Sequence, residues 1–514
     1  MHRFFLPTLY TLAILLLPSH VSRQHDVALP PLVRATAITG ATLIDGSGRP
    51  RVENSVVILR GDAIEEVGKN GHVTIPLGSR IIDGRGLVLA PGFIDTHNHS
   101  DRGFDSDPTA RSQVSQGITT VAVGQDGSSN LPIAQFLRKL DVAPVALNVL
   151  TFVGHATVRS RIMAGKTQRE ASTREVEQMK ELVAQAMKEG AFGLSTGLEY
   201  EDGKHATTAE LISLAQVAGR YRGIYISHIR DEADQTFKAL AEAIEIGRQS
   251  QLPVQVSHLK LGSVSVWERA DEVVALVNKA RKQGLDVTAD CYPYDAWNST
   301  IRVLIPSGRH DDPNEVRKGL DAVGGAGNIT IVSCQSYPNY EQRTLAEIAA
   351  QEGISPISLY MRIVQGGGAT IICKSMKESD IRTFYRQPWV MVSSDGEMNS
   401  RHPRGAGTYP RVLGRYVREL NWLSLEEAIR KMTSLPAERL GLRDRGLIRA
   451  GFKADLVLFD PKTVIDRATF AEPQLISAGI HRVFVNGVEV WLESGVTGHR
   501  PGRPIRSSAR APAS

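Results

Sequence analysis

The sequence predicts an α/β protein built around a (β/α)₈ TIM-like barrel, with a small β-sandwich domain assembled from its N- and C-terminal segments. Three observations predict this fold. Apolar runs alternate with helical patterns through the middle of the chain, strand-like texture flanks that region on both sides, and histidine or aspartate recurs where the apolar runs end. Strands that alternate with helices indicate parallel pairing, which a barrel or an open sheet satisfies.

Eight apolar runs in about 300 residues favour the barrel, whose active site lies at the C-terminal ends of its strands. The helix between the third and fourth runs is marked by a capping box at Ser172 and Glu175 and by Gly190 beyond its end. A doubly wound open sheet is the alternative, but the first strand-to-helix turn has no Gly-x-Gly-x-x-Gly motif. The predicted strands are 87–97, 117–123, 145–153, 190–196, 223–228, 253–258, 286–292 and 389–394.

Domain boundaries follow from changes in this texture. Short strands and Gly-rich turns occupy 35–89 and return in 441–497, so we expect these two segments to pair into the small β domain. The barrel then spans 90–440. Its stretch of about 300–385 is long for one connection and is expected to be an insertion over the barrel mouth.

The two ends of the chain differ from its body. Residues 1–30 begin with Met1-His2-Arg3 and an apolar stretch, which predicts a signal peptide and a periplasmic or secreted bacterial protein. The alternative is that this segment stays uncleaved as an N-terminal anchor. Such an anchor is the one expected contact of the protein with a membrane. Residues 498–514 form a basic tail, expected to be flexible, that carries four of the five net positive charges. The nearly neutral body gives no reason to expect a nucleic-acid partner.

Histidines and one aspartate mark the ends of four predicted strands. His97 and His99 end the first one, and residues i and i+2 of a strand project from the same face, so both imidazoles can face one point. His228 and His258 end two further runs, and Asp395 ends a fourth. A repeated set at equivalent strand ends predicts a metal site rather than scattered structural residues.

Several longer motifs accompany these ligands. They are Pro91-Gly92-Phe93-Ile94-Asp95-Thr96-His97-Asn98-His99, Gly193-Leu194-Ser195-Thr196-Gly197-Leu198-Glu199-Tyr200, Ser227-His228-Ile229-Arg230-Asp231-Glu232, Ser257-His258-Leu259-Lys260, Tyr292-Pro293-Tyr294, Ser394-Asp395-Gly396 and His402-Pro403-Arg404-Gly405. On the combination of these motifs, nearly the whole mature chain resembles the amidohydrolase superfamily and, within it, the D-aminoacylase (N-acyl-D-amino-acid deacylase) family. A His-x-His pair alone would indicate only the superfamily.

The resemblance implies one or two divalent metal ions, usually zinc. His228 and His258 would hold the tight ion, and a second position would be formed by His97, His99 and Asp395. That family places a cysteine in the loop after the second strand, where this chain has Asp126. A carboxylate is a harder ligand than a thiolate and can bridge two ions, so Asp126 is expected to be a ligand that alters metal preference. A turn-capping aspartate is the alternative.

The resemblance also implies the catalytic and substrate-binding residues. Asp395 would act as general base and acid, while Tyr200 would help the metal polarise the scissile carbonyl. The carboxylate of the substrate would be held by Lys260, Tyr292 and Arg404. His155 and His402 are expected to support the site without binding metal.

The predicted reaction is metal-dependent hydrolysis of a small-molecule N-acyl-D-amino acid to a carboxylate and a free D-amino acid. A dipeptidase, or another amide hydrolase of the superfamily such as a hydantoinase or dihydroorotase, is the enzymatic alternative. Several of those enzymes use a carboxylated lysine as a metal bridge. In this chain no lysine stands at a suitable strand end. A non-catalytic periplasmic binding protein is the alternative from another class, and the sequence leaves the oligomeric state open.

Overall fold

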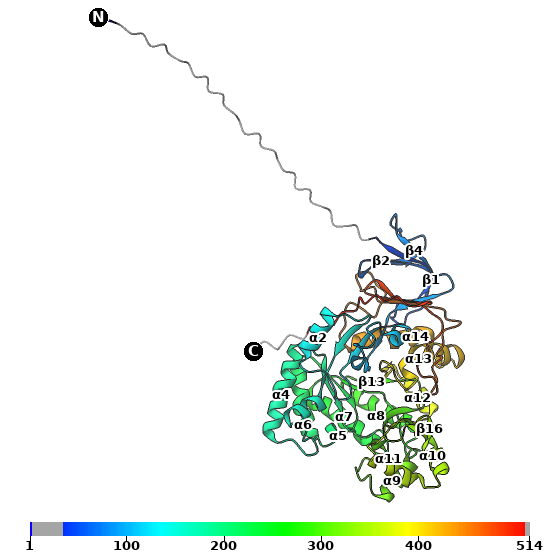
Figure 1. Ribbon diagram of the computed structural model, residues 1–514. Helices are drawn as coiled ribbons and strands as arrows, with labels where there is room; N and C mark the ends of the chain where they lie inside the picture. The colour runs from blue at the N-terminus through cyan, green and yellow to red at the C-terminus, as the bar shows by residue number, and fades with distance from the viewer. Residues whose placement is uncertain (3–33, 509–514) are drawn as a thin grey trace.

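The computed structural model describes residues 1–2 and 34–508, and its main part is a barrel of parallel strands surrounded by helices (Figure 1). Within this described part the barrel has eight strand positions, the third being shared by β8 and β9. A parallel bridge between Asn98 and Gly396 joins the first position to the last, so the predicted (β/α)₈ fold is confirmed. The barrel strands are β6 (Phe93–Asp95), β7 (Ile118–Val123), β8 (Asn148–Thr151), β9 (Val153–Gly154), β10 (Gly193–Gly197), β11 (Ile224–His228), β12 (Val254–Val256), β13 (Val287–Cys291) and β18 (Val390–Val392).

Amphipathic helices cover the barrel. In α4 the Ser172 hydroxyl accepts from the Glu175 amide while the Glu175 carboxylate accepts from the Ser172 amide, as the capping box predicts. The same helix buries Met179, Val183 and Met187 along one stripe, and each such side chain stabilises the fold by roughly 1.5–3 kcal/mol. The helices of the barrel are α1 (Arg111–Val114), α2 (Ile133–Val142), α3 (His155–Ile162), α4 (Thr173–Lys188), α5 (Glu201–Lys204), α6 (Thr208–Arg220), α7 (Thr236–Ser250), α8 (Ala270–Lys282), α12 (Glu378–Tyr385), α13 (Arg404–Arg411), the π-helix η5 (Val412–Glu419), α14 (Leu425–Met432) and α15 (Ser434–Arg439).

The small β domain joins both ends of the barrel region in one sheet, at the top of Figure 1. Its central contact is the antiparallel pairing of β5 with β19, which brings the N- and C-terminal segments together. The order is β22-β21-β20-β19-β5-β1-β2-β3, with β4 on β1. The strands are β1 (Thr36–Leu43), β2 (Val52–Arg60), β3 (Ala63–Lys69), β4 (Arg80–Asp83), β5 (Val88–Pro91), β19 (Leu456–Phe459), β20 (Ile480–Val485), β21 (Val488–Leu492) and β22 (Gly495–Val496).

The predicted strand 87–97 is two strands in the structure, because β5 belongs to the small domain and β6 to the barrel. The break falls at Gly92, whose amide donates to the Asp455 carbonyl of the small domain. A Cβ at Gly92 would lie 2.2 Å from the Thr119 side chain, so only glycine allows the chain to pass between the two sheets here.

An insertion with its own core follows β13. Its sheet contains β14 (Trp297–Thr300), β15 (Ile329–Ser333), β16 (Arg343–Thr344) and β17 (Thr370–Cys373), and its helices are α9 (Pro313–Ala322), α10 (Leu345–Glu352) and α11 (Pro356–Gln365). Ile301, Leu359 and Ile363 are among its fully buried residues. The insertion ends earlier than the expected 385, since α12 packs on α8, β13 and β18 of the barrel.

The basic tail is ordered as far as it is described, in contrast to the flexible tail expected for 498–514. The Gly502 amide donates to Val145 O at 3.0 Å, and the Ile505 amide donates to Val149 O at 2.7 Å. Arg503 also forms an ion pair with Asp62 at 2.7 Å. These backbone bonds add a short strand-like segment beside β8, which explains why this polar, acid-free stretch does not detach.

The predicted signal peptide lies outside the described residues, apart from Met1 and His2. Among the helices of the described chain, none combines the length and the apolar character that crossing a bilayer requires.

Candidate metal centre

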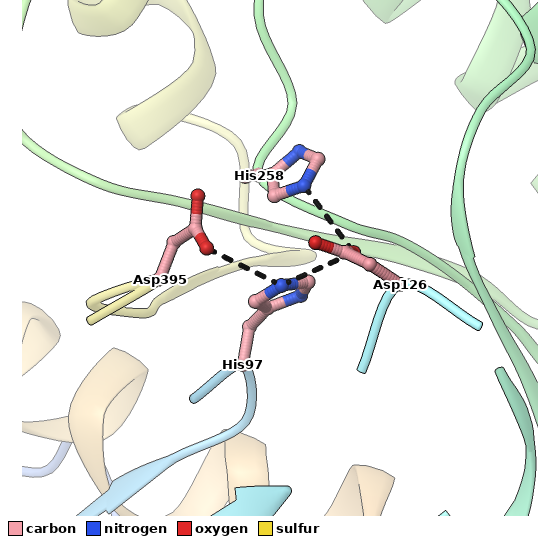
Figure 2. Close-up of side chains that lie close together, drawn as sticks. All are labelled: His97, Asp126, His258 and Asp395. Atoms are coloured by element: carbon pink, nitrogen blue, oxygen red, sulfur yellow. Dashed lines mark ion pairs between the residues drawn. The ribbon is translucent and has the colours of Figure 1, made fainter. Parts of the chain in front are cut away.

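Six predicted ligands from five regions of the barrel meet at one end of it. His97 and His99 lie beyond β6, Asp126 follows β7, His228 ends β11, and the other two residues lie beyond β12 and β18, namely His258 and Asp395. Figure 2 shows His97, Asp126, His258 and Asp395 pointing toward one another. The structure thus brings together residues up to 298 positions apart in the sequence, from His97 to Asp395.

Both histidines of the His-x-His pair face the same two carboxylates. The Nε2 atom of His97 is 3.3 Å from Asp126 Oδ1 and 3.5 Å from Asp395 Oδ1. The Nε2 atom of His99 is 3.3 Å from Asp126 Oδ2 and 3.2 Å from Asp395 Oδ1. The prediction relied on strand alternation, but β6 ends at Asp95, so the turn after the strand, rather than the strand itself, directs these imidazoles.

Asp126 connects this pair to the other two histidines. Its Oδ1 atom lies 3.5 Å from His258 Nε2 and 4.0 Å from His228 Nδ1, and these two nitrogen atoms are 3.1 Å apart. The potential ligand atoms of His97, Asp126, His258 and Asp395 all lie within 4.8 Å of one another. Asp126 could therefore contact an ion held by the His-x-His pair as well as one held by His228 and His258.

Three of these residues adopt unusual backbone conformations. The φ angles of Asp126, His258 and Asp395 are +53°, +34° and +47°, in the left-handed region that residues with a Cβ seldom occupy. Such strain costs about 1–3 kcal/mol per residue and concentrates at functional sites, where it directs side chains. The surrounding bonds enforce it: the His258 amide donates to Asp290 Oδ1 at 2.8 Å, and the Asp395 amide donates to His97 O at 3.0 Å.

The donor atoms of the cluster fit a divalent ion. Both ring nitrogens of His97 and the Oδ1 atom of Asp126 are buried without a hydrogen-bond partner among the described residues. A buried polar atom without a partner is costly, whereas ligation would satisfy it. Imidazoles combined with carboxylates are a donor set typical of zinc-type ions, so the residues present match the expected metal.

Charges in the cluster hold its carboxylates in the ionised form. Burial alone would raise the pKa of Asp126, but the neighbouring imidazoles of His97 and His258 outweigh it and hold that pKa well below its usual range. Burial likewise opposes ionisation of Asp395, yet Arg404, whose Nη1 lies 2.7 Å from Asp395 Oδ2, brings that pKa well below normal. Both carboxylates are therefore ionised and ready to bind a cation.

Two imidazoles take up protons when only the protein's own groups surround them. Burial would lower the pKa of His258, but Glu232 and Asp395 outweigh it and raise that pKa to about 10. Burial also opposes protonation of His99, but hydrogen bonds with Asp126 and Asp395 raise its pKa to about 9. A metal ion binds the neutral imidazole, so it must displace these protons.

Two further carboxylates, which the sequence reasoning did not single out, hold the outer nitrogens of the central histidines. Glu199 Oε2 is 2.9 Å from His228 Nε2, and Glu232 Oε1 is 2.9 Å from His258 Nδ1. Each contact leaves the other ring nitrogen facing the cluster, which is the usual arrangement around a metal-ligating histidine. In the sequence, the signals that could have identified these residues are weak. Glu199 directly precedes Tyr200, and Glu232 lies four residues after His228.

The predicted carboxylate-binding residues lie next to the cluster. Lys260 Nζ is 2.6 Å from Glu232 Oε2 and 2.7 Å from His258 Nδ1, and Arg404 is paired with Asp395 as described above. Tyr292 lies between the two cations, since its ring centroid is 5.7 Å from Lys260 Nζ and 4.9 Å from the Arg404 guanidinium carbon. Tyr200 faces the ligands, with its hydroxyl 3.3 Å from His228 Nδ1.

His155 and His402 lie outside the cluster. His155 Nε2 is 2.9 Å from Glu210, which also pairs with Arg159 in a buried network. His402 Nδ1 accepts a hydrogen bond from the Arg404 amide at 3.1 Å. Burial holds the pKa of His402 well below its usual range, so this neutral ring fixes the backbone that carries Arg404.

The cluster opens into a cavity of about 730 Å³. Its walls include His99, Asp126, Tyr200, His228 and His258 from the barrel, together with residues of the insertion. A cavity of this size is typical of sites for small organic molecules.

Comparison with known proteins places these features in a family. The model described as "Amidohydrolase family" matches residues 80–491. The chain is 36% identical to a D-aminoacylase of Alcaligenes xylosoxydans xylosoxydans over 92% of this chain and 97% of that protein. It is 37% identical to an N-acyl-D-aspartate deacylase of the same organism over 91% and 94% of the two chains. A solved structure of N-acyl-D-glutamate deacylase from Bordetella bronchiseptica, with zinc and a phosphonate mimic of the tetrahedral intermediate, matches with TM-score 0.83 and 35% identity over 92% of this chain and all of that one.

Proposed function

The chain belongs to the amidohydrolase family, within its D-aminoacylase branch, and from that premise we propose that it hydrolyses the amide bond of N-acyl-D-amino acids. The products are a carboxylate and a free D-amino acid. The relatives named above act on such substrates, and one of them is a zinc complex. The protein is accordingly a metal-dependent amide hydrolase.

The observation that carries this proposal is the combination of two sites in one cavity. A cluster of imidazoles and carboxylates with metal-ligand spacing lies beside Lys260 and Arg404, two buried cations with Tyr292 between them. An N-acyl-amino acid presents an amide and a carboxylate a few bonds apart, so both halves of the arrangement are needed to hold it.

The residues that would hold the metal are His97, His99, His228, His258, Asp126 and Asp395. When bound, a divalent ion lowers the pKa of water toward ~7 and polarises an amide carbonyl. Asp126 replaces the expected cysteine as the shared ligand, and its harder oxygen suits zinc as well as other first-row divalent ions.

Asp395 is the candidate general base and acid. It is ionised at neutral pH, and its Oδ1 atom faces the ligand cluster, so it is placed to accept a proton from the attacking water and to deliver one to the leaving nitrogen. Arg404 fixes its orientation through the 2.7 Å contact with Oδ2, which leaves Oδ1 facing His97 and His99.

The other side chains position the substrate. Lys260, Tyr292 and Arg404 would receive the substrate carboxylate, and Arg404 is suited to this by its planar array of donors. Burial and the surrounding carboxylates raise the pKa of Tyr200 well above normal, so its hydroxyl keeps its proton and can donate to the developing oxyanion.

The test is amine release from matched N-acetyl-D- and N-acetyl-L-amino acids by the zinc-loaded protein. Release from the D series, with at most traces from the L series, is the expected result. Activity confined to the L series, or to D-containing dipeptides, would replace this proposal with another amide hydrolysis of the same family.

We also propose that the protein is exported to the bacterial periplasm. The support is the sequence of residues 1–30, in which a short basic start precedes an apolar stretch too short for an ordinary membrane span. Recovery of the protein in the periplasmic fraction of the producing cell is expected, and recovery in the cytosol would contradict the proposal.

A further inference from the structure

The loop between β19 and β20 leaves the small β domain and packs against the barrel helix α13. It covers residues 460–479, and we name it the small-domain loop. Its Ser477 hydroxyl donates to the Ala406 carbonyl at 2.8 Å. A Cβ at Gly407 would lie 2.9 Å from the Cβ of Asp466, so the loop and the helix are in close contact here. The small-domain loop therefore lies directly against α13, whose first residue is predicted to bind the substrate carboxylate.

Asp466 of this loop joins the two barrel segments that carry Tyr292 and Arg404. Its side chain is 8% exposed, and its Oδ2 atom accepts a hydrogen bond from Arg411 Nη1 at 3.1 Å. The Tyr294 hydroxyl lies 3.3 Å from the same Oδ2 atom. Arg411 ends α13 and Tyr294 follows β13, so one carboxylate from the small domain holds one residue of each segment.

Arg411 extends the link to the segment of Tyr292. Its Nε atom donates to the Pro293 carbonyl at 2.7 Å, and Pro293 directly follows Tyr292. Its guanidinium carbon also lies 4.7 Å from the centroid of the Tyr294 ring. The donors of a guanidinium lie in one rigid plane, so a partner that holds one of them also fixes the direction of the others. Asp466 therefore orients the Arg411 donor that holds the backbone beside Tyr292.

Tyr294 extends the link to the segment of Arg404. Its hydroxyl is 3.5 Å from the Pro403 carbonyl, which immediately precedes Arg404. The residue is 3% exposed, so this hydroxyl depends on protein partners rather than on water. Asp466 supplies the nearer partner and so keeps the hydroxyl beside the backbone that begins α13.

We propose that Asp466 is a positioning residue that keeps Tyr292 and Arg404 at the spacing the substrate carboxylate requires. This rests on the proposed deacylase function and deepens it, because it gives the small β domain a part in substrate binding. The Arg404 guanidinium carbon lies 4.9 Å from the Tyr292 ring centroid, although the two residues follow different strands. A shift of one segment by ~1 Å would separate groups that must reach one carboxylate together. Asp466 does not line the cavity, so it acts through these residues.

The test measures kcat and KM of zinc-loaded Asp466→Ala protein for N-acetyl-D-methionine. We expect KM to rise at least ~10-fold while kcat stays within about threefold of wild type, because carboxylate binding weakens and the metal cluster is untouched. Asp466→Asn keeps an oxygen for Arg411 and Tyr294, so its KM should lie within about threefold of wild type. An unchanged KM in Asp466→Ala would overturn the inference while leaving the deacylase function intact.

Arg418→Met is the matched control for a loss of stability alone. Arg418 Nη1 donates to the Val464 carbonyl at 2.6 Å, a bond that holds the same loop outside the link through Arg411 and Tyr294. Tm should fall in both Arg418→Met and Asp466→Ala, whereas KM should rise only in Asp466→Ala. An equal rise of KM in the two variants would show that Asp466 acts only through the stability of the loop, which would overturn the inference.

Tyr294→Phe tests the same link without leaving a buried charge unpaired. It keeps the ring against Arg411 and removes the hydroxyl beside Asp466 and Pro403. We expect KM to rise ~2–10-fold with kcat unchanged, the effect of one lost hydrogen bond. If Asp466→Ala fails to fold, an unchanged KM in Tyr294→Phe overturns the inference instead. If the wild-type protein hydrolyses no N-acetyl-D-amino acid, the proposed function fails and this inference fails with it.

Discussion

Asp126 is the residue at which this chain departs from the pattern it otherwise resembles. Its Oδ1 atom is buried, has no hydrogen-bond partner among the described residues and lies within 4.0 Å of nitrogen atoms of His97, His228 and His258. Its positive φ aims the carboxylate at the three imidazoles. These contacts favour a metal-ligand role for Asp126 over the alternative role of capping its own turn.

Replacing Asp126 by Ala is expected to weaken zinc binding by more than the ~10–100-fold that loss of an outer partner costs, because a direct ligand is removed. Zinc content after dialysis against a fixed free-zinc concentration measures the effect. Asp126→Cys, which restores an anionic ligand, serves as the control and should retain zinc. Unchanged zinc content in Asp126→Ala would return this residue to a role in its own turn.

Asp395 should matter for turnover more than for metal binding, since its second oxygen faces Arg404 and four imidazoles remain to hold the ion. Asp395→Asn is expected to lower kcat by ~10²–10⁴-fold, the range typical of a lost general base. Zinc content measured on the same sample should stay near the wild-type value. A kcat close to wild type would remove Asp395 from the proton-transfer steps.

At the scale of the elements, the site is built by the turns that follow the strands. The predicted strand 253–258 ends at Val256 in the structure, and His258 then takes φ +34°, which turns its ring toward Asp126. Apolar runs therefore predicted where the strands lie but not where they stop. The positive φ values come from long-range bonds, such as the one from the His258 amide to Asp290, which periodicity does not reveal.

The tail is an element whose composition misled the prediction. Its arginines and prolines resemble a flexible segment, yet its backbone bonds to Val145 and Val149 hold it along the barrel. Such pairing depends on free backbone groups beside β8, which are a property of the fold rather than of the tail sequence.

Truncation after Thr497 is accordingly expected to destabilise the protein. Each of the lost backbone hydrogen bonds contributes roughly 0.5–1.5 kcal/mol, so Tm should fall by several degrees. Truncation after Ser508, which retains these bonds, is the matched control and should leave Tm unchanged. Equal Tm values for both truncated proteins would show that the tail adds no stability.

On the scale of the whole molecule, the barrel, the insertion and the metal cluster were predictable to different degrees. Repeated strand-end histidines predicted the barrel and the cluster, because parallel strands bring their C-terminal ends together. Glu199 and Glu232 were missed because an acidic residue near a histidine is common and only their 2.9 Å contacts identify their role. The insertion over the barrel mouth was predicted from the length of the 300–385 stretch, but its core and its end before α12 depend on contacts that no sequence spacing encodes.

Protonation of the cluster makes metal binding depend on pH. The pKa values of His99 and His258 are raised from 6.5 to about 9 and about 10, so in the metal-free protein both imidazoles are protonated at pH 7.5 and zinc must displace their protons. Apparent zinc affinity should therefore rise with pH and level off near pH 10. Calorimetric titration in buffers of different protonation enthalpy should detect proton release at pH 7.5. An affinity independent of pH between 7 and 9 would contradict these pKa values.

The most direct test of metal-dependent deacylation is stepwise zinc reloading of the chelated full-length protein, with release of free D-methionine from N-acetyl-D-methionine as the readout. Negligible release is expected after chelation, followed by activity that rises with bound zinc until the tight site is filled. Undiminished release from protein shown by elemental analysis to be metal-free would contradict it.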